Sequence, residues 1–381
     1  MKYKVYTEDD MITSKSIRNT FFNKKFFIMV VAFFIIVFIF LVMYDMSKKG
    51  PNSIGTTNLQ QETISMVWEQ RFPKIAPLPR TTHATAYIGN NEVLIFGGEV
   101  KNSGRATTFW CGNDTWIYNI TLNEWRKVNT LKSPLPRVHI PMAYDFDDNV
   151  VLLFGGMCNE PNKSYLLNDT WIFNVTTKEW IEKKPKNSPY KQSDSSLVYI
   201  GKSNFLMRTA GGETWIYNTL SDNWSLINRG LPIRGSAALA FDPDKNIVLS
   251  FGGEQSQIDE YYNDTWEYDI FSNKWTEINT FLAPEERARV AFTYDEKHKF
   301  FVLFGGVTSQ FGKRFNDTWI YNTTNKNWTK IKTLNTPPAR GGYYGMPYDP
   351  SLNLFLLFGG RHDPMTFLNA TWILKYNTKN E

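Results

Sequence analysis

The sequence predicts an all-β fold in which six small antiparallel sheets stack around an axis, and three features support this prediction. Six apolar runs end in a Gly-Gly pair, and successive pairs are separated by 41 to 58 residues. A Thr-Trp pair follows each Gly-Gly pair, and in the first five copies a second Trp lies nine residues further on. A repeat of this length indicates an array of similar supersecondary units. The first Trp of each copy is Trp116, Trp171, Trp215, Trp266, Trp319 or Trp372.

Within each copy, the order of residues predicts four antiparallel strands. The first strand ends near an aromatic residue, and a polar turn such as Asp242-Pro243-Asp244-Lys245-Asn246 follows it. Turn residues of this kind join antiparallel strands. The second strand is apolar throughout, as in Val93-Leu94-Ile95-Phe96, which indicates that both of its faces are buried. The third strand carries the Thr-Trp pair, and the fourth carries the second Trp.

The Gly-Gly pair followed by two spaced tryptophans resembles the kelch motif, and this resemblance covers residues 64–381. A kelch repeat forms one blade of a β-propeller, so the resemblance implies a six-bladed β-propeller of four-stranded antiparallel blades. The third copy departs from the pattern, because only Glu213 separates Gly212 from Thr214. We expect a truncated blade there, with a gap in the rim of loops.

The sixth copy predicts how the ring closes. Glu381 lies nine residues after Trp372, so this copy lacks a second Trp and a fourth strand. Trp68 lies twelve residues before Arg80, and the same spacing separates Trp125 from Arg137, Trp275 from Arg287 and Trp328 from Arg340. We therefore expect residues 65–72 to form the last blade's fourth strand. Deleting the chain through Phe72 should unfold or aggregate the propeller, because it opens two sheet edges. Deleting only the first 60 residues should leave a soluble domain, and circular dichroism with size-exclusion chromatography would separate these outcomes.

The N-terminal segment differs from the rest of the chain. Residues 26–44 carry no charge and are mostly Phe, Ile, Val, Leu and Met. As a helix they would span about 28 Å, close to the hydrocarbon thickness of a bilayer. Six basic residues precede this run and two follow it before Arg71, which predicts a cytoplasmic N-terminus. We expect a cytoplasmic segment (1–24), a transmembrane signal anchor (25–45), a linker (46–63) and an extracellular or lumenal propeller (64–381). A buried core helix is the alternative for the apolar run.

Composition excludes some functions. The chain is 42% hydrophobic and 16% aromatic, with a formal net charge of +5, which argues against disorder. No basic cluster suited to reading bases occurs, so we expect no nucleic-acid partner. His83 and His139 occupy nearly equivalent positions in adjacent copies, but no tight pair of metal ligands is present. We expect no metal, no cofactor and no catalytic set.

Arginines recur just before the first strand of five copies, and they are the main candidates for ligand binding. In kelch propellers this region shares a face with the loops between strands two and three. A ring of arginines there would favour an anionic glycan, phosphate or an acidic peptide. The alternative is that each arginine pairs with a neighbouring carboxylate or loop carbonyl. Glu99 and Glu254 directly follow Gly-Gly pairs and either contribute to the site or balance the arginines. The arginines are Arg80, Arg137, Arg234, Arg287 and Arg340.

The two cysteines and several asparagines suggest modification outside the cytoplasm. Cys111 and Cys158 lie in the loops between strands two and three of the first two copies. We expect a disulfide between them, with two free packed cysteines as the alternative. Asn-x-Ser/Thr sequons are frequent, and those within the repeat itself are expected to be structural. The expected glycosylation sites are the turn sequons at Asn119, Asn174 and Asn322.

Three functions are compatible with this sequence. The first is a membrane-anchored, extracytoplasmic binding module whose loop face recognises a protein or a glycan. The second follows from the resemblance, because kelch propellers include sialic-acid mutarotases, and the arginine ring would suit an acidic sugar. The third is a cell-envelope scaffold without a dedicated ligand. Glycan binding without anomerisation would favour the first function.

Overall fold

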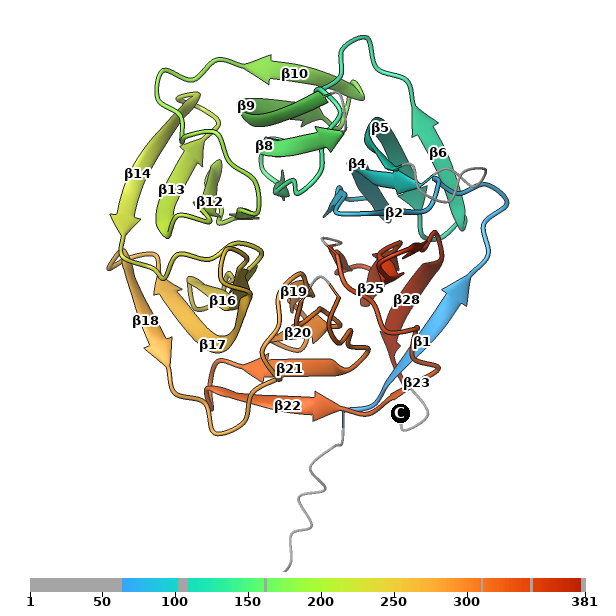
Figure 1. The fold of residues 1–381 in the computed structure, drawn as a ribbon, viewed down its shortest axis with the longest axis vertical. Coiled ribbons are helices and arrows are strands. Elements are labelled where there is room, and N and C mark those ends of the chain that lie inside the picture. The colour runs from blue at the N-terminus through green and yellow to red at the C-terminus, as the bar shows by residue number, and fades with distance from the viewer. Residues whose placement is uncertain (1–63, 102–108, 161–162, 310, 343–344, 378–381) are drawn as a thin grey trace, which may run out of the picture. The chain divides into compact units, whose positions relative to one another are not determined.

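Six antiparallel sheets surround a central axis, so the predicted six-bladed propeller is confirmed (Figure 1). The structure is a computed structural model, and it describes residues 64–377 apart from 102–108, 161–162, 310 and 343–344. The apolar run 26–44, on which the predicted anchor falls, lies outside the described residues. The regular secondary structure of the described part consists of β-strands. No helix in that part is long and apolar enough to cross a membrane.

Each blade places its first strand nearest the axis and its fourth strand at the rim (Figure 1). The strands of blades 1 to 3 are β2 (Arg80–Thr81), β3 (Ala84–Tyr87), β4 (Glu92–Lys101), β5 (Phe109–Asn119) and β6 (Glu124–Val128); β7 (Met142–Asp145), β8 (Val150–Glu160), β9 (Lys163–Asn174) and β10 (Glu179–Lys183); and β11 (Ser196–Tyr199), β12 (Asn204–Arg208), β13 (Glu213–Asn218) and β14 (Asn223–Arg229). The strands of blades 4 to 6 are β15 (Ala238–Asp242), β16 (Ile247–Gln255), β17 (Glu260–Asp269) and β18 (Lys274–Ile278); β19 (Ala291–Asp295), β20 (Phe300–Phe304), β21 (Thr318–Asn322) and β22 (Asn327–Ile331); and β24 (Tyr348–Asp349), β25 (Leu354–Phe358), β28 (Thr371–Tyr376) and β1 (Met66–Arg71).

Blade 6 is closed by a strand from the other end of the propeller domain, as the sequence predicts. β1 pairs antiparallel with β28, and the register places Met66 opposite Tyr376 and Arg71 opposite Thr371. The side chains of Met66 and Trp68 are fully buried. Two short additions accompany this blade: β23 (Thr333–Leu334) pairs parallel with β1, and β26 (Arg361–Asp363) pairs with β27 (Thr366–Phe367).

The Gly97-Gly98 pair lets the backbone that enters the first strand of the same blade approach the end of the second strand. Gly97 and Gly98 have φ angles of 64° and 98°, which L side chains rarely adopt. A Cβ atom added at Gly98 would lie 2.7 Å from the His83 Cβ and from the Thr81 carbonyl oxygen. Glycine is therefore required here both by the backbone conformation and by the lack of room for a side chain, because the entry into the first strand packs directly on the pair.

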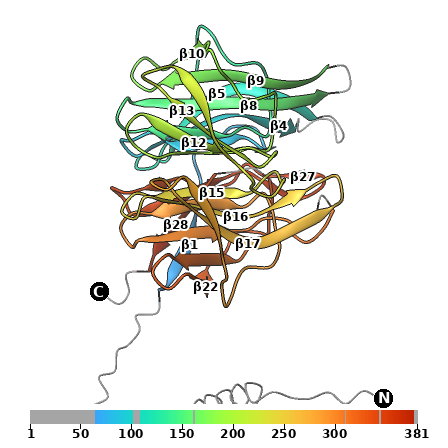
Figure 2. The same ribbon diagram turned by 90° about the vertical axis from the view of Figure 1, so that its left-hand side faces the viewer.

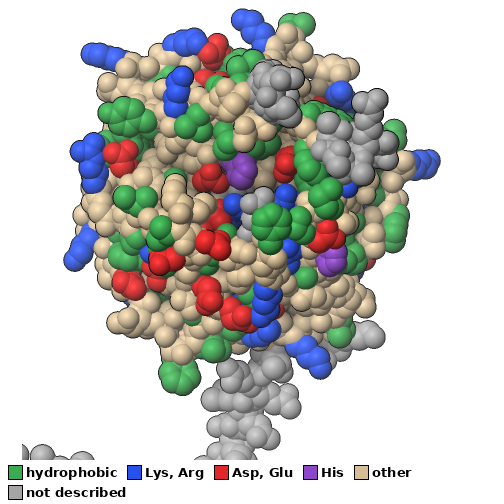
Figure 3. All heavy atoms as spheres, viewed as in Figure 1, with side chains coloured by type: hydrophobic (Ala, Val, Ile, Leu, Met, Phe, Trp, Pro, Cys, Tyr) green, Lys and Arg blue, Asp and Glu red, His purple; other side chains and the backbone are tan. Residues whose placement is uncertain are grey.

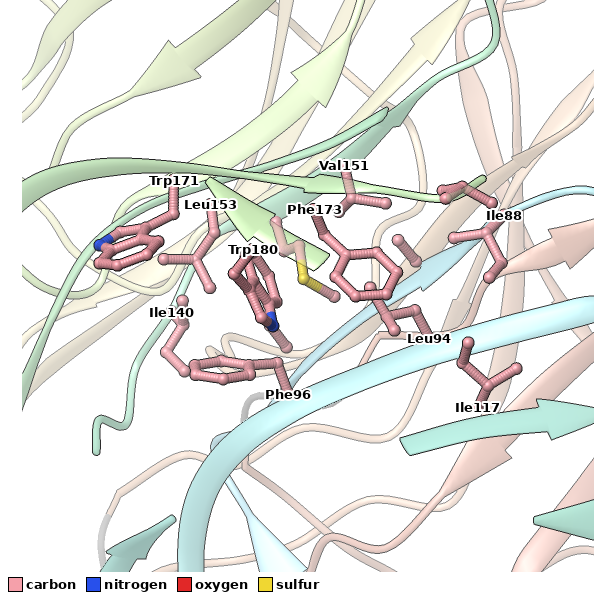
Figure 4. Packing of buried hydrophobic residues seen from close by; sticks show 14 residues of the cluster. Ile88, Leu94, Phe96, Ile117, Ile140, Val151, Leu153, Trp171, Phe173 and Trp180 are labelled. Carbon is pink, nitrogen blue, oxygen red and sulfur yellow. The ribbon is translucent and has the colours of Figure 1, made fainter. Parts of the chain in front are cut away.

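Neighbouring blades are joined by an aromatic contact that recurs around the ring. The second Trp of one blade packs on the Phe that precedes the Gly-Gly pair of the blade before it. Figure 4 shows this at the contact of blades 1 and 2, where Trp180 lies on Phe96 at a centroid distance of 5.0 Å. The same contact joins Trp224 to Phe154, Trp328 to Phe251, Trp68 to Phe304 and Trp125 to Phe358.

A hydrogen bond accompanies most of these contacts. The Trp indole N–H donates to the Thr of the preceding blade's Thr-Trp pair, as in Trp180 Nε1 to Thr115 Oγ1 at 3.0 Å. Four further bonds have the same form: Trp125 to Thr371, Trp224 to Thr170, Trp275 to Thr214 and Trp328 to Thr265. At the closure the equivalent atoms are Trp68 Nε1 and Thr318 Oγ1, and neither has a hydrogen-bond partner. The contact between blades 5 and 6 is therefore held by packing without this bond, whereas blade 6 keeps the bond to blade 1 through Trp125 and Thr371.

The third blade keeps all four strands, and its shortening is confined to the hairpin between β12 and β13. The turn there spans only Thr209 to Gly212, and the Gly212 N–H donates to the Thr209 carbonyl at 3.1 Å. Arg208 pairs with Thr214 as Phe96 pairs with Thr115, so by strand register it takes the place of that Phe. Its guanidinium donates to the Arg234 and Pro232 carbonyls, and burial followed by the charge of Arg234 lowers its pKa to about 9.

Candidate binding site at the loop face

We call one end of the propeller the loop face, because the second-to-third-strand hairpins and the entries into the first strands meet there. The long hairpins β8–β9 and β16–β17 extend on this side (Figure 2). An axial cavity of about 640 Å³ runs between the first strands of all six blades. At the loop-face end it is lined by His83, Ser195, Ser236 and Arg289.

The five predicted ring arginines occupy equivalent positions, and each is buried inside the frame of the propeller. Arg137 is fully buried, and its Nη1 and Nη2 each donate to one carboxylate oxygen of Asp169 at 2.7 Å. Its Nε donates to the Leu135 carbonyl, and Nη1 also donates to the carbonyl of Gly155, the first Gly of the pair. The same aspartate accepts the indole N–H of Trp171 at 2.7 Å. The corresponding ion pairs are Arg80–Asp114, Arg234–Asp264 and Arg287–Asp317.

These contacts agree with the alternative in which each arginine pairs with a neighbouring carboxylate or loop carbonyl. Burial opposes ionisation of Asp169, but the hydrogen bonds and charge of Arg137 outweigh it, so the pKa of this carboxyl lies below its ordinary value. Arg340 makes the matching bonds to the Pro338 and Gly359 carbonyls, and Ala370 stands at the position of the aspartate. In blade 3 the matching positions hold Gln192 and Glu213 instead of an Arg and an Asp.

A second ring lies two residues after each arginine position, and the sequence analysis missed it. One residue per blade has a positive φ there, and the backbone N–H of His139, Ser236 and Arg289 each donates to the carbonyl of the ring residue in the preceding blade. Five of the six are not glycine, and such strained positions persist only where the surrounding structure fixes them. The six residues are Thr82, His139, Asp194, Ser236, Arg289 and Gly342.

Polar side chains link four blades around this second ring. His139 Nδ1 lies 2.9 Å from Asp194 Oδ1, and Ser236 Oγ donates to Asp194 Oδ1 and to Glu254 Oε1. Arg289 donates to the same Glu254 oxygen through Nε at 2.9 Å and Nη2 at 2.7 Å. Glu254 is 2% exposed, so it acts here as an internal counter-charge that holds the Arg289 guanidinium.

Three arginines from blades 5 and 6 meet at this end of the molecule. Arg314 lies between β20 and β21, and Arg361 follows the last Gly-Gly pair. Burial lowers the pKa of Arg314, and the positive charge of Arg361 lowers it further; Asp363 opposes the shift, and Arg289 adds a smaller lowering. Burial also lowers the pKa of Arg361, where Glu99 opposes the shift and Arg289 adds to it. The three guanidinium groups are therefore close enough to repel one another.

The other predicted site residues lie near this cluster. Glu99 reaches Arg361 with an Oε2 to Nη1 distance of 3.8 Å, while Glu254 holds Arg289. Neither carboxylate pairs with an arginine of the predicted ring in the contacts described. Figure 3 views the loop face and shows acidic, basic and histidine side chains gathered toward its centre.

The predicted Cys111–Cys158 disulfide is present and joins the hairpins of blades 1 and 2. Its sulfur atoms pack beside Val138 in a small buried cluster. The predicted glycosylation sites are turn residues: the side-chain carbonyls of Asn119, Asn174 and Asn322 accept backbone N–H groups two or three residues further on. Their glycosylation stays a prediction.

The two histidines of adjacent blades do not form a joint site. His83 is buried against Phe358, whereas His139 faces Asp194. Burial, followed by the charge of Arg80, lowers the pKa of His83 to about 3, so its imidazole is neutral. In the part of the chain that the structure describes, no group of three or more His, Cys, Asp and Glu could hold a metal ion.

Comparison with known proteins defines the class. A family model for the "KLHDC2/KLHL20/DRC7 Kelch-repeats domain" matches residues 46–231 and 210–380, so the chain belongs to the kelch-repeat family. Human Kelch domain-containing protein 3 is 24% identical over 288 residues, which cover 68% of this chain and 72% of that protein.

Two larger proteins also contain similar segments. The flagellar outer-arm dynein alpha chain of Chlamydomonas reinhardtii is 30% identical over 165 residues, covering 41% of this chain but 3% of the dynein. Drosophila melanogaster Host cell factor is 23% identical over 282 residues, covering 71% of this chain and 16% of that protein. The similarity therefore covers only a small part of each of these two proteins.

Proposed function

We propose that this propeller is a protein-binding module that holds an acidic segment of a partner at its loop face, against Arg289, Arg314 and Arg361. The observation that carries the proposal is the convergence of these three guanidinium groups: the charges of Arg361 and Arg289 lower the pKa of Arg314, and the charge of Arg289 lowers that of Arg361. An anionic ligand would relieve their repulsion, and guanidinium groups bind carboxylates through paired hydrogen bonds. A kelch propeller is commonly a protein-binding module, which favours an acidic peptide over an anionic glycan as the ligand.

Display selection on the full-length chain tests this proposal. A random peptide library should yield binders enriched in Asp and Glu. Charge reversal by Arg314→Glu or Arg361→Glu should weaken the best binder by about tenfold or more, with the loss increasing at low salt. Lys274→Glu at the rim of blade 4 is the matched control, since it makes the same charge change on an exposed strand. Enrichment of neutral or basic peptides, or equal affinity in all variants, would contradict the proposal. Binding restricted to a sulfated or sialylated glycan array would instead favour the glycan alternative.

We also propose that residues 26–44 anchor the chain in a membrane, with the N-terminus in the cytoplasm and the propeller on the other side. Two features support this: the uncharged run of membrane-spanning length, and a disulfide in the propeller, since disulfides persist mainly in oxidising compartments. In this setting the loop face would bind extracellular or lumenal partners, and Asn119, Asn174 and Asn322 would be open to glycosylation.

Protease protection tests the proposed topology. The protein carries a tag at each end. Protease added outside intact cells or right-side-out vesicles should remove the C-terminal tag and leave the N-terminal tag. Peptide-N-glycosidase should shift the mass of the mature chain if the turn sequons are modified. Protection of the C-terminal tag, together with two reactive thiols in unreduced protein, would contradict the topology.

A further inference from the structure

The end of the axial cavity opposite the loop face has a different chemistry. We call this end the turn face, because the tight turns between first and second strands lie there. The cavity volume of about 640 Å³ lies within the range of small-molecule sites, which is roughly 300–1,000 Å³. Its middle is walled largely by apolar side chains, among them Met142, Leu197, Val290, Phe292 and Met346. An apolar ligand body would fit this wall.

Aromatic side chains surround the cavity at the turn face. Six of the seven occupy the equivalent aromatic position at or near the end of each first strand, and Phe146 is an addition that only blade 2 carries. Phe146 is 54% exposed, and its ring lies 4.9 Å from the Tyr144 ring and 6.1 Å from the Tyr199 ring. Aromatic rings attract cations through their electron-rich faces. The lining aromatics are Tyr87, Tyr144, Phe146, Tyr199, Phe241, Tyr294 and Tyr348.

The charges around this opening are mainly negative. The turns that follow the first strands of blades 2 to 6 contain eight carboxylates and four lysines. Lys299 pairs with Asp244, and Lys245 is drawn outward to the hydroxyls of Thr323 and Thr324. Lys202 and Lys297 are exposed, and His298 pairs with buried Asp295. The eight acidic residues are Asp145, Asp147, Asp148, Asp242, Asp244, Asp295, Glu296 and Asp349.

Glu296 is the carboxylate that lines the cavity itself. It has no hydrogen bond or ion pair with any residue that the structure describes. Nearby, Asp145 and Asp349 end their first strands and are fully buried, and the Oδ1 atom of each accepts a backbone N–H of the turn that follows. The charge of Lys299 acts on Glu296, but Lys299 pairs with Asp244, so carboxylates still outnumber cations at the turn face.

The cavity is electrically polarised along its length. Arg289 lines the loop-face end and Glu296 lines the turn-face end, and both belong to the chain segment that contains β19. The five-residue strand β19 lies between them, and its extended backbone spans about 17 Å. An elongated cation would therefore be repelled by the arginine end and attracted to the turn face, whereas an anion would have the reverse preference.

We propose that the axial cavity is a second binding site, entered from the turn face, for a small organic cation with an apolar body, such as a quaternary alkylammonium. The aromatic rim and Glu296 hold the cationic group, and the apolar wall holds the body. This site is independent of the proposed acidic-peptide site, because it uses another face and the opposite ligand charge.

Calorimetric titration of the full-length chain tests the second site with three probes that share one alkyl chain: hexyltrimethylammonium, hexane-1-sulfonate and hexan-1-ol. The cation should bind and the other two should bind at least about tenfold more weakly. Glu296→Gln and Phe146→Ala should each weaken cation binding by about three- to tenfold. Both changes are at exposed side chains and should leave the fold intact, and Glu277→Gln on the outer strand β18 is the matched control.

Two results would overturn the proposal. One is binding of the sulfonate or the alcohol as tightly as the cation, which would mean that charge is not recognised. The other is cation binding that both Glu296→Gln and Phe146→Ala leave unchanged, or no cation binding at up to about 10 mM, a concentration that corresponds to very weak affinity. An intact acidic-peptide interaction in the same variants would separate failure here from failure of the loop-face proposal.

Discussion

Two sets of arginines differ in what surrounds them, and the difference separates the frame of this propeller from its site. Arg137 is fully buried, and Asp169 accepts from it with both oxygens. Arg314 lies between β20 and β21 and Arg361 begins the short strand β26, where they and Arg289 repel one another. The first kind recurs around the ring and has a fixed carboxylate partner in four blades. The cluster of Arg289, Arg314 and Arg361 occurs at one place in the ring. Residues that recur hold blades together, and residues that occur once are free to carry specificity.

The largest effect should come from breaking the frame. Arg137→Met leaves the Asp169 carboxylate without its cation in a mostly buried position, so we expect a loss of about 3 kcal/mol or more in the free energy of unfolding. Urea denaturation followed by circular dichroism measures this. Adding Asp169→Leu should restore part of the loss, because it removes the uncompensated charge. A single variant as stable as the wild type would show that these pairs do not hold the frame.

The buried imidazole of His83 gives a second test, through the pH dependence of the free energy of unfolding. Its pKa falls from 6.5 to about 3 on folding because burial, then the charge of Arg80, disfavours the imidazolium. The unfolded chain takes up a proton near pH 6.5 and the folded chain does not, so this contribution to stability is complete above pH 6.5 and decreases as the pH falls toward 3.

Between pH 7 and pH 5 the His83 contribution should amount to about 2 kcal/mol. His83→Leu should remove that part of the pH dependence without a cost at pH 7, since neither imidazole nitrogen has a hydrogen-bond partner. His362→Leu, at an exposed position, is the control for the unfolding curves. An unchanged pH dependence in His83→Leu would contradict the burial argument.

A smaller change in the free energy of unfolding should come from the Trp–Thr hydrogen bond between neighbouring blades. This change can be compared between blades 1 and 2 and the closure of the ring. Thr115→Val removes the acceptor of the Trp180 indole bond and leaves that N–H buried, so we expect a loss of about 1–2 kcal/mol. Thr318→Val at the closure should cost less than about 0.5 kcal/mol, because Thr318 Oγ1 and Trp68 Nε1 make no hydrogen bond. The difference between the two unfolding free energies is the quantity to measure. Equal losses would mean that the closing bond forms in solution.

The smallest effect on stability should come from the loop-face cluster. Arg314→Ala and Arg361→Ala each remove one of three mutually repelling charges, so the free energy of unfolding should stay within about 0.5 kcal/mol of the wild-type value. A loss of unfolding free energy similar to that of Arg137→Met would show that these arginines stabilise the fold. That result would contradict the distinction between the two sets of arginines.

The frame could be predicted from sequence because its residues repeat. Spacing alone identified the six blades, and the position of Trp68 relative to Arg80 identified the strand that closes the ring. The Cys111–Cys158 bond was also predictable, because the repeat placed both cysteines on neighbouring hairpins. Periodicity carries this information because each blade must bury the same faces against its neighbours.

The candidate site could not be predicted in the same way. Recurrence drew attention to Arg137 and its equivalents, whose recurrence reflects pairing within the frame. Arg314 and Arg361 lie in loops of unequal length, so no spacing rule places them together. One signal was available: the residue two positions after each ring arginine varies from Thr82 to Arg289, and variation at a fixed structural position indicates a surface that differs between blades.

The most direct test of the central claim is one calorimetric comparison of peptide binding. The acidic peptide selected on the full-length chain is titrated into the wild type and into the Arg314→Ala, Arg361→Ala double variant, with the unfolding curve of each protein recorded alongside. We predict at least about a thirtyfold loss of affinity in the double variant with an unchanged unfolding free energy. Undiminished affinity in a folded double variant would contradict the assignment of the loop-face arginines as the binding site.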